Sequence, residues 1–417
     1  MLRLGSWLGR APATLGRDRW RNTSATARGP GVDILIAGVS VRGLVESAVR
    51  SGLGHRIVAV DYFGDFDLGL LCESRSIKRD LGLAYDVRHL MTATQDFTFD
   101  ALAFTANLEN YPLVVEALRG GKPVLGNGMS ALSSVRDPGR FFGFLERSGF
   151  QAPKISFSSP TVESGTPWLR KPVQSGGGHG IAVHVPGSSL EPGYILQEYL
   201  DGLPCAAVFV ANGQECCLLG ISEQVIGDQA FGASGFRYCG SILGPARAGQ
   251  LGGDDLIDRV QHVVEGITRA FHLIGVNGMD FVLKGGAIYP LEINPRYTAS
   301  MELVERAYGV SIFGCHLAAC QGSLPAFHLA ARDQADFFGK AILFASEDLT
   351  FRRPLWWFER GARDLPFEGE RIGRGRPVCT VFSRGPSRAE CYDGLVKAAA
   401  EVRQAPAETS KSGEVRR

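Results

Sequence analysis

Two short apolar stretches near residue 285 carry polar side chains in a pattern suited to metal binding. Residues 275–283 and 287–294 are separated by a Lys-Gly-Gly turn, which predicts a β-hairpin. Side chains alternate along a strand, so Glu292 and Asn294 share one face, and Asp280 can approach that face from the first strand. Two carboxylates and an amide oxygen are hard ligands that suit Mg²⁺ bridging phosphates. The alternative is a surface hairpin with solvated acids.

A glycine-rich turn earlier in the chain is suited to binding the phosphates themselves. Lys171 ends a predicted strand, and the turn after it leads into another strand at Ile181. Backbone without Cβ atoms can approach an anion closely, and the lysine adds a positive charge. The candidate phosphate-binding residues of the turn are Ser175, Gly176, Gly177, Gly178 and Gly180. Arg296, directly after the hairpin, offers a planar fork for phosphate or carboxylate.

A third pattern allows a different class of function. A strand over residues 32–37 is followed by Gly38, Ser40 and Gly43, and the next predicted strand ends at Asp61. A dinucleotide fingerprint would have glycine at the middle position, where Ser40 stands, and would use the acid to bind a ribose. The pattern therefore favours a Rossmann-like domain without its own nucleotide, with an NAD-dependent oxidoreductase as the alternative.

Composition excludes several other classes. The 417 residues carry a formal net charge of +1, which gives no bulk attraction to nucleic acid or to an anionic membrane. No run approaches the ~20 apolar residues of a membrane span. The nine cysteines form no Cys-x-x-Cys pair, which indicates a reducing compartment, so we expect a cytoplasmic protein. Glycine is in excess, because 53 of the 417 residues are glycine, about one in eight, whereas average usage is about 7%.

Taken in chain order, these motifs resemble the ATP-grasp superfamily. The resemblance rests on the lysine–glycine turn, on Gln197-Glu198-Tyr199-Leu200, on Asp280 and on Glu292-Ile293-Asn294-Pro295-Arg296, and it covers about residues 32–390. More narrowly, the chain resembles predicted ATP-dependent carboligases of methanogens and methylotrophs, which are related to biotin carboxylase. The resemblance implies ATP and Mg²⁺, with Mn²⁺ as an alternative metal, as cofactors.

The resemblance also implies roles for single residues. Lys171 and the glycine turn would hold the ATP phosphates, and Asp280, Glu292 and Asn294 would bind the metal. Arg296, together with Lys171, would act in catalysis by stabilising the transferred phosphoryl group. The proposed adenine contacts are Gln197, Glu198 and the backbone of Leu200.

Two departures from the family pattern bear on the substrate. Where the family carries an early phosphate-binding lysine, this chain has arginines, and Arg140 or Arg136 is expected to replace it. Where biotin carboxylase has the glutamate that deprotonates bicarbonate, this chain has Ser300, with Glu302 two residues later. We therefore expect an ATP-dependent carboxylate–amine ligase acting on a small carboxylic acid and an amine. A bicarbonate-dependent carboxylase and a catalytically silent nucleotide-binding protein are the alternatives.

The expected fold is a mixture of α/β and α+β parts. We expect a disordered Arg-rich leader (residues 1–30, with a transit peptide as the alternative), a Rossmann-like pre-ATP-grasp domain (31–130), a two-lobed ATP-grasp domain (131–325, lid about 155–200), a small β-rich C-terminal domain like that of biotin carboxylase (326–403) and a polar tail (404–417). By analogy with relatives of this layout we expect a homodimer. The kinship with methylotroph proteins suggests biosynthesis of a one-carbon-carrier coenzyme.

Overall fold

The computed structural model combines helices with parallel and antiparallel sheets, which confirms the expected mixed fold class. It describes residues 31–158, 167–246, 251, 253–332 and 334–404. The expected leader and nearly all of the expected tail lie outside the described residues, as does part of the expected lid. Within the described part of the chain, no helix is long and apolar enough to cross a membrane.

The N-terminal elements form a parallel sheet, as the alternation of strands and helices predicted. Its strands are β1 (Asp33–Ala37), β2 (Arg56–Asp61), β3 (Glu73–Ser76) and β4 (Ala101–Phe104), in the order β3-β2-β1-β4. Helices α1 (Arg42–Arg50), α2 (His89–Thr94) and α3 (Pro112–Arg119) alternate with them. Ile34, Leu35 and Ile36 are all fully buried, because helices cover both faces of a parallel sheet.

A long antiparallel sheet forms the centre of the molecule. Its strand order is β13-β12-β9-β10-β11-β14-β17. The strands are β9 (Leu203–Asn212), β10 (Cys216–Ile226), β11 (Tyr238–Leu243), β12 (Ile274–Lys284), β13 (Ala287–Asn294), β14 (Phe337–Phe344) and β17 (Pro377–Gly385). Because β11 pairs with β14, the sheet is continuous across the boundary expected near residue 325. The hairpin predicted around residue 285 is formed by β12 and β13.

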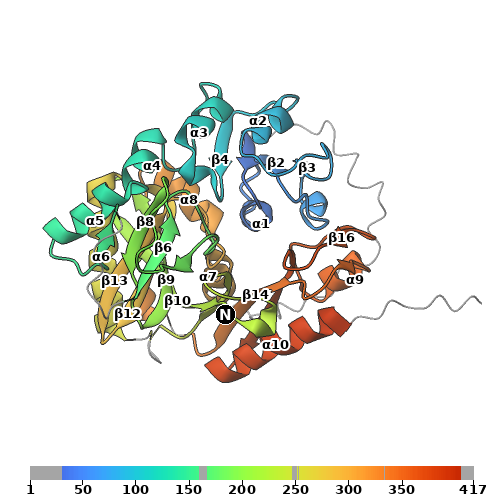
Figure 1. Ribbon diagram of the computed structural model, residues 1–417. Helices are drawn as coiled ribbons and strands as arrows, with labels where there is room; N and C mark the ends of the chain where they lie inside the picture. Colours follow the sequence, from blue (N-terminus) through green and yellow to red (C-terminus); the bar gives the residue numbers. More distant parts are fainter. Residues whose placement is uncertain (1–30, 159–166, 247–250, 252, 333, 405–417) are drawn as a thin grey trace, which may run out of the picture.

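A third, smaller sheet coincides with the expected lid. Its strands are β5 (Ile155–Ser156), β6 (Trp168–Pro172), β7 (Ala182–Val183) and β8 (Tyr194–Glu198), in the order β5-β8-β6-β7. Further helices are α4 (Met129–Val135), α5 (Pro138–Arg147), α6 (Asp254–Phe271), α7 (Met301–Tyr308), α8 (Ile312–Cys320), α9 (Pro354–Glu359) and α10 (Arg388–Gln404), and β15 (Leu349–Thr350) pairs with β16 (Arg371–Ile372). Figure 1 shows the blue N-terminal elements at the top, the green and yellow strands at the lower left and α10 at the bottom.

His316 on α8 joins the N-terminal part of the chain to the long sheet. The backbone N–H of Val276 donates to its Nδ1 at 3.0 Å, so Nε2 carries the proton and donates to the carbonyl of Leu125 at 3.1 Å. A Cβ atom on Gly275 would lie 2.5 Å from the imidazole ring, so this close approach requires glycine. Burial lowers the pKa of His316 to about 4, and the ring is therefore neutral near neutral pH.

This buried histidine should make the free energy of unfolding depend on pH. The ordinary pKa is 6.5 and the folded pKa is about 4, so the unfolded chain binds the proton more readily. The stabilising contribution is therefore complete above pH 6.5 and is lost as the pH falls through 4, by on the order of 3 kcal/mol. Denaturant unfolding at a series of pH values measures this slope. The His316→Asn variant, which cannot titrate, should show a shallower slope, and an equal slope in both proteins would contradict the assignment.

Candidate active site

A cavity of about 420 Å³ lies over one face of the long sheet. Glu292 on β13 pairs with Asp280 on β12, and at the other edge Ser241 on β11 pairs with Lys340 on β14. Gln224 on β10 is the cross-strand partner of Ser241, and its side chain donates to Asp280 across β9, which connects these two pairs. Paired residues of neighbouring strands project from the same face of a sheet, so this row of side chains forms the floor of the cavity.

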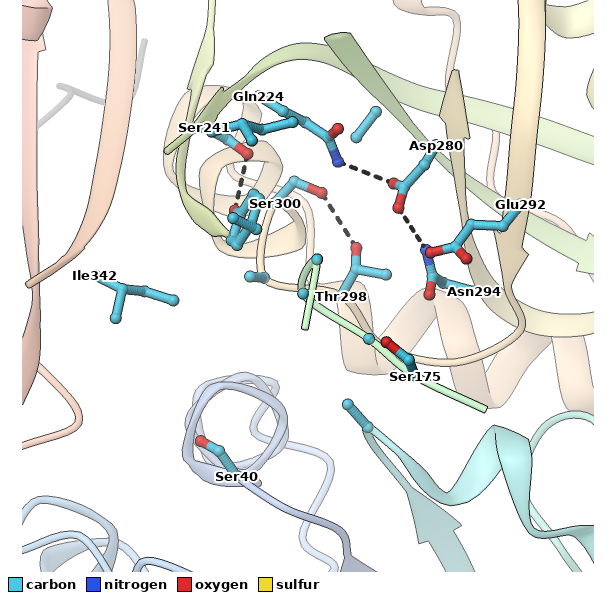
Figure 2. A pocket seen from close by; sticks show the side chains of 18 of the residues that line it. Ser40, Ser175, Gln224, Ser241, Asp280, Glu292, Asn294, Thr298, Ser300 and Ile342 are labelled. Carbon is cyan, nitrogen blue, oxygen red and sulfur yellow. Dashed lines mark hydrogen bonds between the residues drawn. The ribbon is translucent and has the colours of Figure 1, made fainter. Parts of the chain in front are cut away.

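The polar groups of the hairpin converge as the alternation predicted. Asn294 donates to Oδ2 of Asp280 at 3.1 Å, and Gln224 donates to Oδ1 of the same carboxylate at 3.0 Å. Figure 2 shows both hydrogen bonds, with Glu292 beside Asn294. Among the described residues no cluster of three or more His, Cys, Asp or Glu could hold a metal ion. A metal here would therefore need the amide of Asn294 in addition to the two carboxylates.

The two carboxylates have opposite pKa shifts. Burial, reinforced by the negative charge of Glu292, raises the pKa of Asp280 to about 7. Burial acts to raise the pKa of Glu292 as well, but the charges of Lys171 and Arg136 lower it to about 2. Nζ of Lys171 lies 3.1 Å from the Glu292 carboxylate. The repulsion between Asp280 and Glu292 is the kind of energy that a bound divalent cation would relieve, so the donor set fits a metal.

The glycine turn after Lys171 forms a wall of the cavity. Ser175, Gly176, Gly177 and Gly178 line it, whereas Gly180 does not. Gly178 has φ +76°, and a Cβ atom there would lie 1.8 Å from the carbonyl oxygen of Phe236. The turn thus packs directly on the connection between β10 and β11, which explains why this position needs glycine.

Arg296 is held over the hairpin by a carboxylate that sequence reasoning missed. Its Nε and Nη2 donate to Oε1 of Glu109 at 3.0 and 2.8 Å, and Nη2 also donates to Oδ1 of Asn294 at 3.0 Å. Glu109 is 1% exposed and belongs to the N-terminal part of the chain. No sequence motif marks Glu109, because it lies 187 positions from its partner.

The structure separates the two arginines that the sequence left open. Arg136 donates to the carbonyl of Ile293 at 3.0 Å and approaches Glu292 to 3.5 Å. Arg140 is exposed on the first turn of α5, and its guanidinium donates to Ser134 at 3.2 Å. Arg136 is therefore the arginine beside the hairpin, although neither arginine lines the cavity.

The adenine contacts expected from the resemblance are only partly brought to the cavity. Gln197 lines it, and its Nε2 is buried without a hydrogen-bond partner among the described residues. Glu198 and Leu200 do not line it, and the Glu198 carboxylate accepts from the backbone N–H of Lys154 at 3.1 Å. The side chain of Glu198 is therefore engaged in joining β8 to the segment before β5.

The acid of the NAD alternative does not line the cavity. Asp61 is fully buried and accepts from the backbone N–H groups of Gly64, at 2.8 Å, and Val41, at 3.4 Å. Its carboxylate thus closes the turns after β1 and β2. A Cβ atom on Gly38 would lie 2.1 Å from Oγ1 of Thr105, so tight packing against the end of β4 explains that glycine.

Glu302 is also unsuited to the role of a general base. Its carboxylate accepts hydrogen bonds from Arg42 and Lys340. Burial acts to raise the pKa of Glu302, but these two cations hold it well below its ordinary value. Ser300, at the position of the bicarbonate-activating glutamate, lines the cavity and cannot replace a carboxylate.

Comparisons with known proteins agree with this site. A family model described as an ATP-grasp domain matches residues 136–300. The large chain of carbamoyl phosphate synthase from Kocuria rhizophila is 25% identical over 220 residues, which are 48% of this chain and 19% of that protein. The curated relatives are thus matched over only about a fifth of their own length.

Solved structures extend the likeness to most of the fold. Biotin carboxylase from Campylobacter jejuni, in a β-γ-ATP complex, superposes with a TM-score of 0.64 at 13% identity, covering 87% of this chain and 89% of that one. The L-amino acid ligase from Bacillus licheniformis gives a TM-score of 0.61 at 16% identity, covering 90% and 98%. Residues 136–300 therefore carry an ATP-grasp domain, and the chain has a biotin-carboxylase-like fold. The resemblance to the ATP-grasp superfamily is confirmed, and the narrower likeness to methanogen and methylotroph carboligases stays a prediction.

The pairing of Arg296 with Glu109 can be tested through stability. Arg296→Ala should lower the free energy of unfolding by about 3–5 kcal/mol, because it leaves a buried carboxylate unpaired. The double variant Glu109→Gln/Arg296→Ala should recover part of that loss, since an amide is cheaper to bury than a charge. Denaturant unfolding measures both values. A double variant no more stable than Arg296→Ala would show that the buried charge is not the cause.

Proposed function

We propose that the protein is an ATP-dependent carboxylate–amine ligase that forms an amide through an acyl phosphate. The observation that carries this proposal is the register of the hairpin, which sets Asp280 opposite Glu292 with Asn294 bonded to Asp280. The same cavity holds Lys171, the glycine turn and Arg296. Metal ligands and phosphate-binding groups thus meet in one space, as phosphoryl transfer requires.

ATP and Mg²⁺, or Mn²⁺ in its place, are the cofactors of this proposal. Asp280, Glu292 and Asn294 would hold the metal, which neutralises phosphate charge when bound. Lys171 is paired with Glu292, and a metal on that carboxylate would free the lysine to contact phosphate. The buried Nε2 of Gln197, which has no hydrogen-bond partner among the described residues, could donate to the adenine. Glu198 and Leu200 lie outside the cavity lining, at and just after the end of β8, and could contact the adenine only from there.

The acceptor is a small carboxylic acid in this proposal. Its carboxylate oxygen attacks the γ-phosphorus and ADP leaves; an amine then attacks the acyl carbon, phosphate leaves and the nitrogen loses a proton. Arg296, fixed by Glu109 and Asn294, is positioned to stabilise charge on the transferred group without reorganising. Two features disfavour bicarbonate as the acceptor: the serine at position 300 and the ion-paired Glu302.

Other parts of the proposal rest on the resemblance alone. A role in one-carbon-carrier coenzyme biosynthesis and a homodimer stay predictions, as do the domain boundaries; the cytoplasmic location, which was expected from the cysteine pattern, also stays a prediction. Neither the acid nor the amine is specified by the cavity floor, because substrate pockets of one fold vary with their loops.

The proposed activity can be tested without knowing the amine. Hydroxylamine intercepts acyl phosphates as hydroxamates, so a panel of small carboxylic acids with ATP and Mg²⁺ should contain at least one that yields hydroxamate and ADP. The reaction should stop when EDTA removes the metal. ADP release that requires bicarbonate and gives no hydroxamate with any acid would favour the carboxylase alternative instead.

Removal of one metal ligand should abolish turnover without unfolding the protein. Glu292→Gln keeps the shape of the side chain but removes the charge opposite Asp280, and we expect ADP release to fall at least a thousandfold, about 4 kcal/mol of barrier. Glu265→Gln, at a half-buried position of α6 that does not line the cavity and is paired with Arg269 at 3.6 Å, is a control that should retain activity. Circular dichroism should show the same fold for both. Retained ADP release in Glu292→Gln would overturn the metal assignment.

A further inference from the structure

The end of the cavity beyond the hairpin is lined by charged side chains from distant parts of the chain. They are Arg42 on α1, Glu302 on α7, Lys340 on β14 and Asp364, which lies between α9 and β16. Arg42 and Lys340 both donate to Glu302. The two cations at this end are therefore already paired and do not offer a free positive charge to a ligand.

Asp364 is the member of this group that faces the open space. Its side chain is 25% exposed, whereas those of Arg42, Glu302 and Lys340 are 2%, 3% and 4% exposed. Arg42 donates to Oδ1 of Asp364 at 2.9 Å and to Oδ2 at 3.0 Å, and Thr380 donates to Oδ2. A carboxylate offers about four lone-pair sites, so Oδ1 keeps capacity for another donor.

The backbone holds Asp364 in place. Its φ is +55°, in the left-handed region that non-glycine residues seldom occupy. The backbone N–H groups of Asp364 and Leu365 donate to the buried carboxylate of Asp67 at 3.0 and 2.8 Å. Such conformations persist where the surroundings over-determine them, and they cluster at binding sites. Burial acts to raise the pKa of Asp364, but Arg42 holds it below its ordinary value, so the carboxylate stays charged.

We propose that this end of the cavity binds the amine substrate as a cation, with its ammonium group on the carboxylate of Asp364; the ammonium gives one proton to water before the nitrogen attacks the acyl carbon. This inference rests on the proposed ligase function and adds a substrate class and a residue that selects it. An ammonium group has three donors, and hydroxyls of Ser40, Ser300 and Thr380 line the same cavity as further acceptors. A phosphorylated amine would need an exposed cation here, and both cations are buried and paired.

The test combines paired ligands with paired variants. Short linear primary amines and alcohols of the same length differ in charge but little in shape. Asp364→Asn removes the charge and keeps the shape, and asparagine tolerates a positive φ. Asp336→Asn is the matched control, because Asp336 is 27% exposed and also paired with an arginine, Arg384, but does not line the cavity. The melting temperature of wild type and of Asp336→Asn should rise more with amines than with alcohols, and Asp364→Asn should lose this difference.

Kinetics give a second reading of the same inference. In steady-state ADP release the KM for the amine should rise about tenfold or more in Asp364→Asn, as expected when a charge-assisted contact is lost, with a smaller change in kcat. Equal stabilisation of the wild type by amines and alcohols would overturn the inference. This comparison uses the wild type alone, so it does not depend on whether a variant folds. An unchanged KM in Asp364→Asn would overturn it too. Failure of the proposed ligase function can be told apart from failure of this inference. If the ligase function is wrong, no acid yields hydroxamate, but the melting temperatures with amines and alcohols can still be compared.

Discussion

The guanidinium of Arg42 is the interaction on which the arrangement of the chain depends. It is buried and donates to Glu46 in its own helix at 2.9 Å, to Glu302 and to Asp364. These last two partners lie 260 and 322 positions away. An unpaired buried charge costs several kcal/mol, so the N-terminal helix, the segment after the hairpin and the C-terminal segment must meet at this group. The cavity opens at that meeting point.

Different interactions bring the side chains together at the two ends of the cavity. At the hairpin, polar groups converge because neighbouring strands pair in register, and Asp280 lies opposite Glu292. At the Arg42 end, charges converge because three separate segments pack together. One continuous sheet face connects the two ends through Gln224 and Ser241, so the proposed phosphoryl-transfer site and the proposed amine site share a single cavity.

Features that depend on neighbouring residues could be predicted from the sequence, whereas contacts between residues far apart in the chain could not. The parallel sheet and the β12–β13 hairpin could be predicted because strand alternation and turn residues are local signals. The choice between Arg136 and Arg140 could not, since Arg136 follows the end of α4, Arg140 lies in α5, and only the packing of these two helices decides which side chain reaches Glu292. Gly180 and Glu198 were expected at the site and lie outside its lining; for Glu198 the reason is that neighbouring residues of a strand point to opposite faces, so Gln197 lines the cavity and Glu198 does not.

The sequence by itself determined the order and type of the groups that point to ATP and a metal: the lysine, the glycine turn and the Glu-x-Asn-Pro-Arg motif. It did so because the residues of each motif are close together in the sequence, and their spacing determines which of them share one face of a strand or turn. Only the tertiary structure decided that Glu109 holds Arg296, that Arg42 and Lys340 neutralise Glu302, and that Asp364 faces the cavity. Those pairs are far apart along the chain, and only the packing of sheets and helices, driven by burial of their apolar faces, brings them within hydrogen-bonding distance.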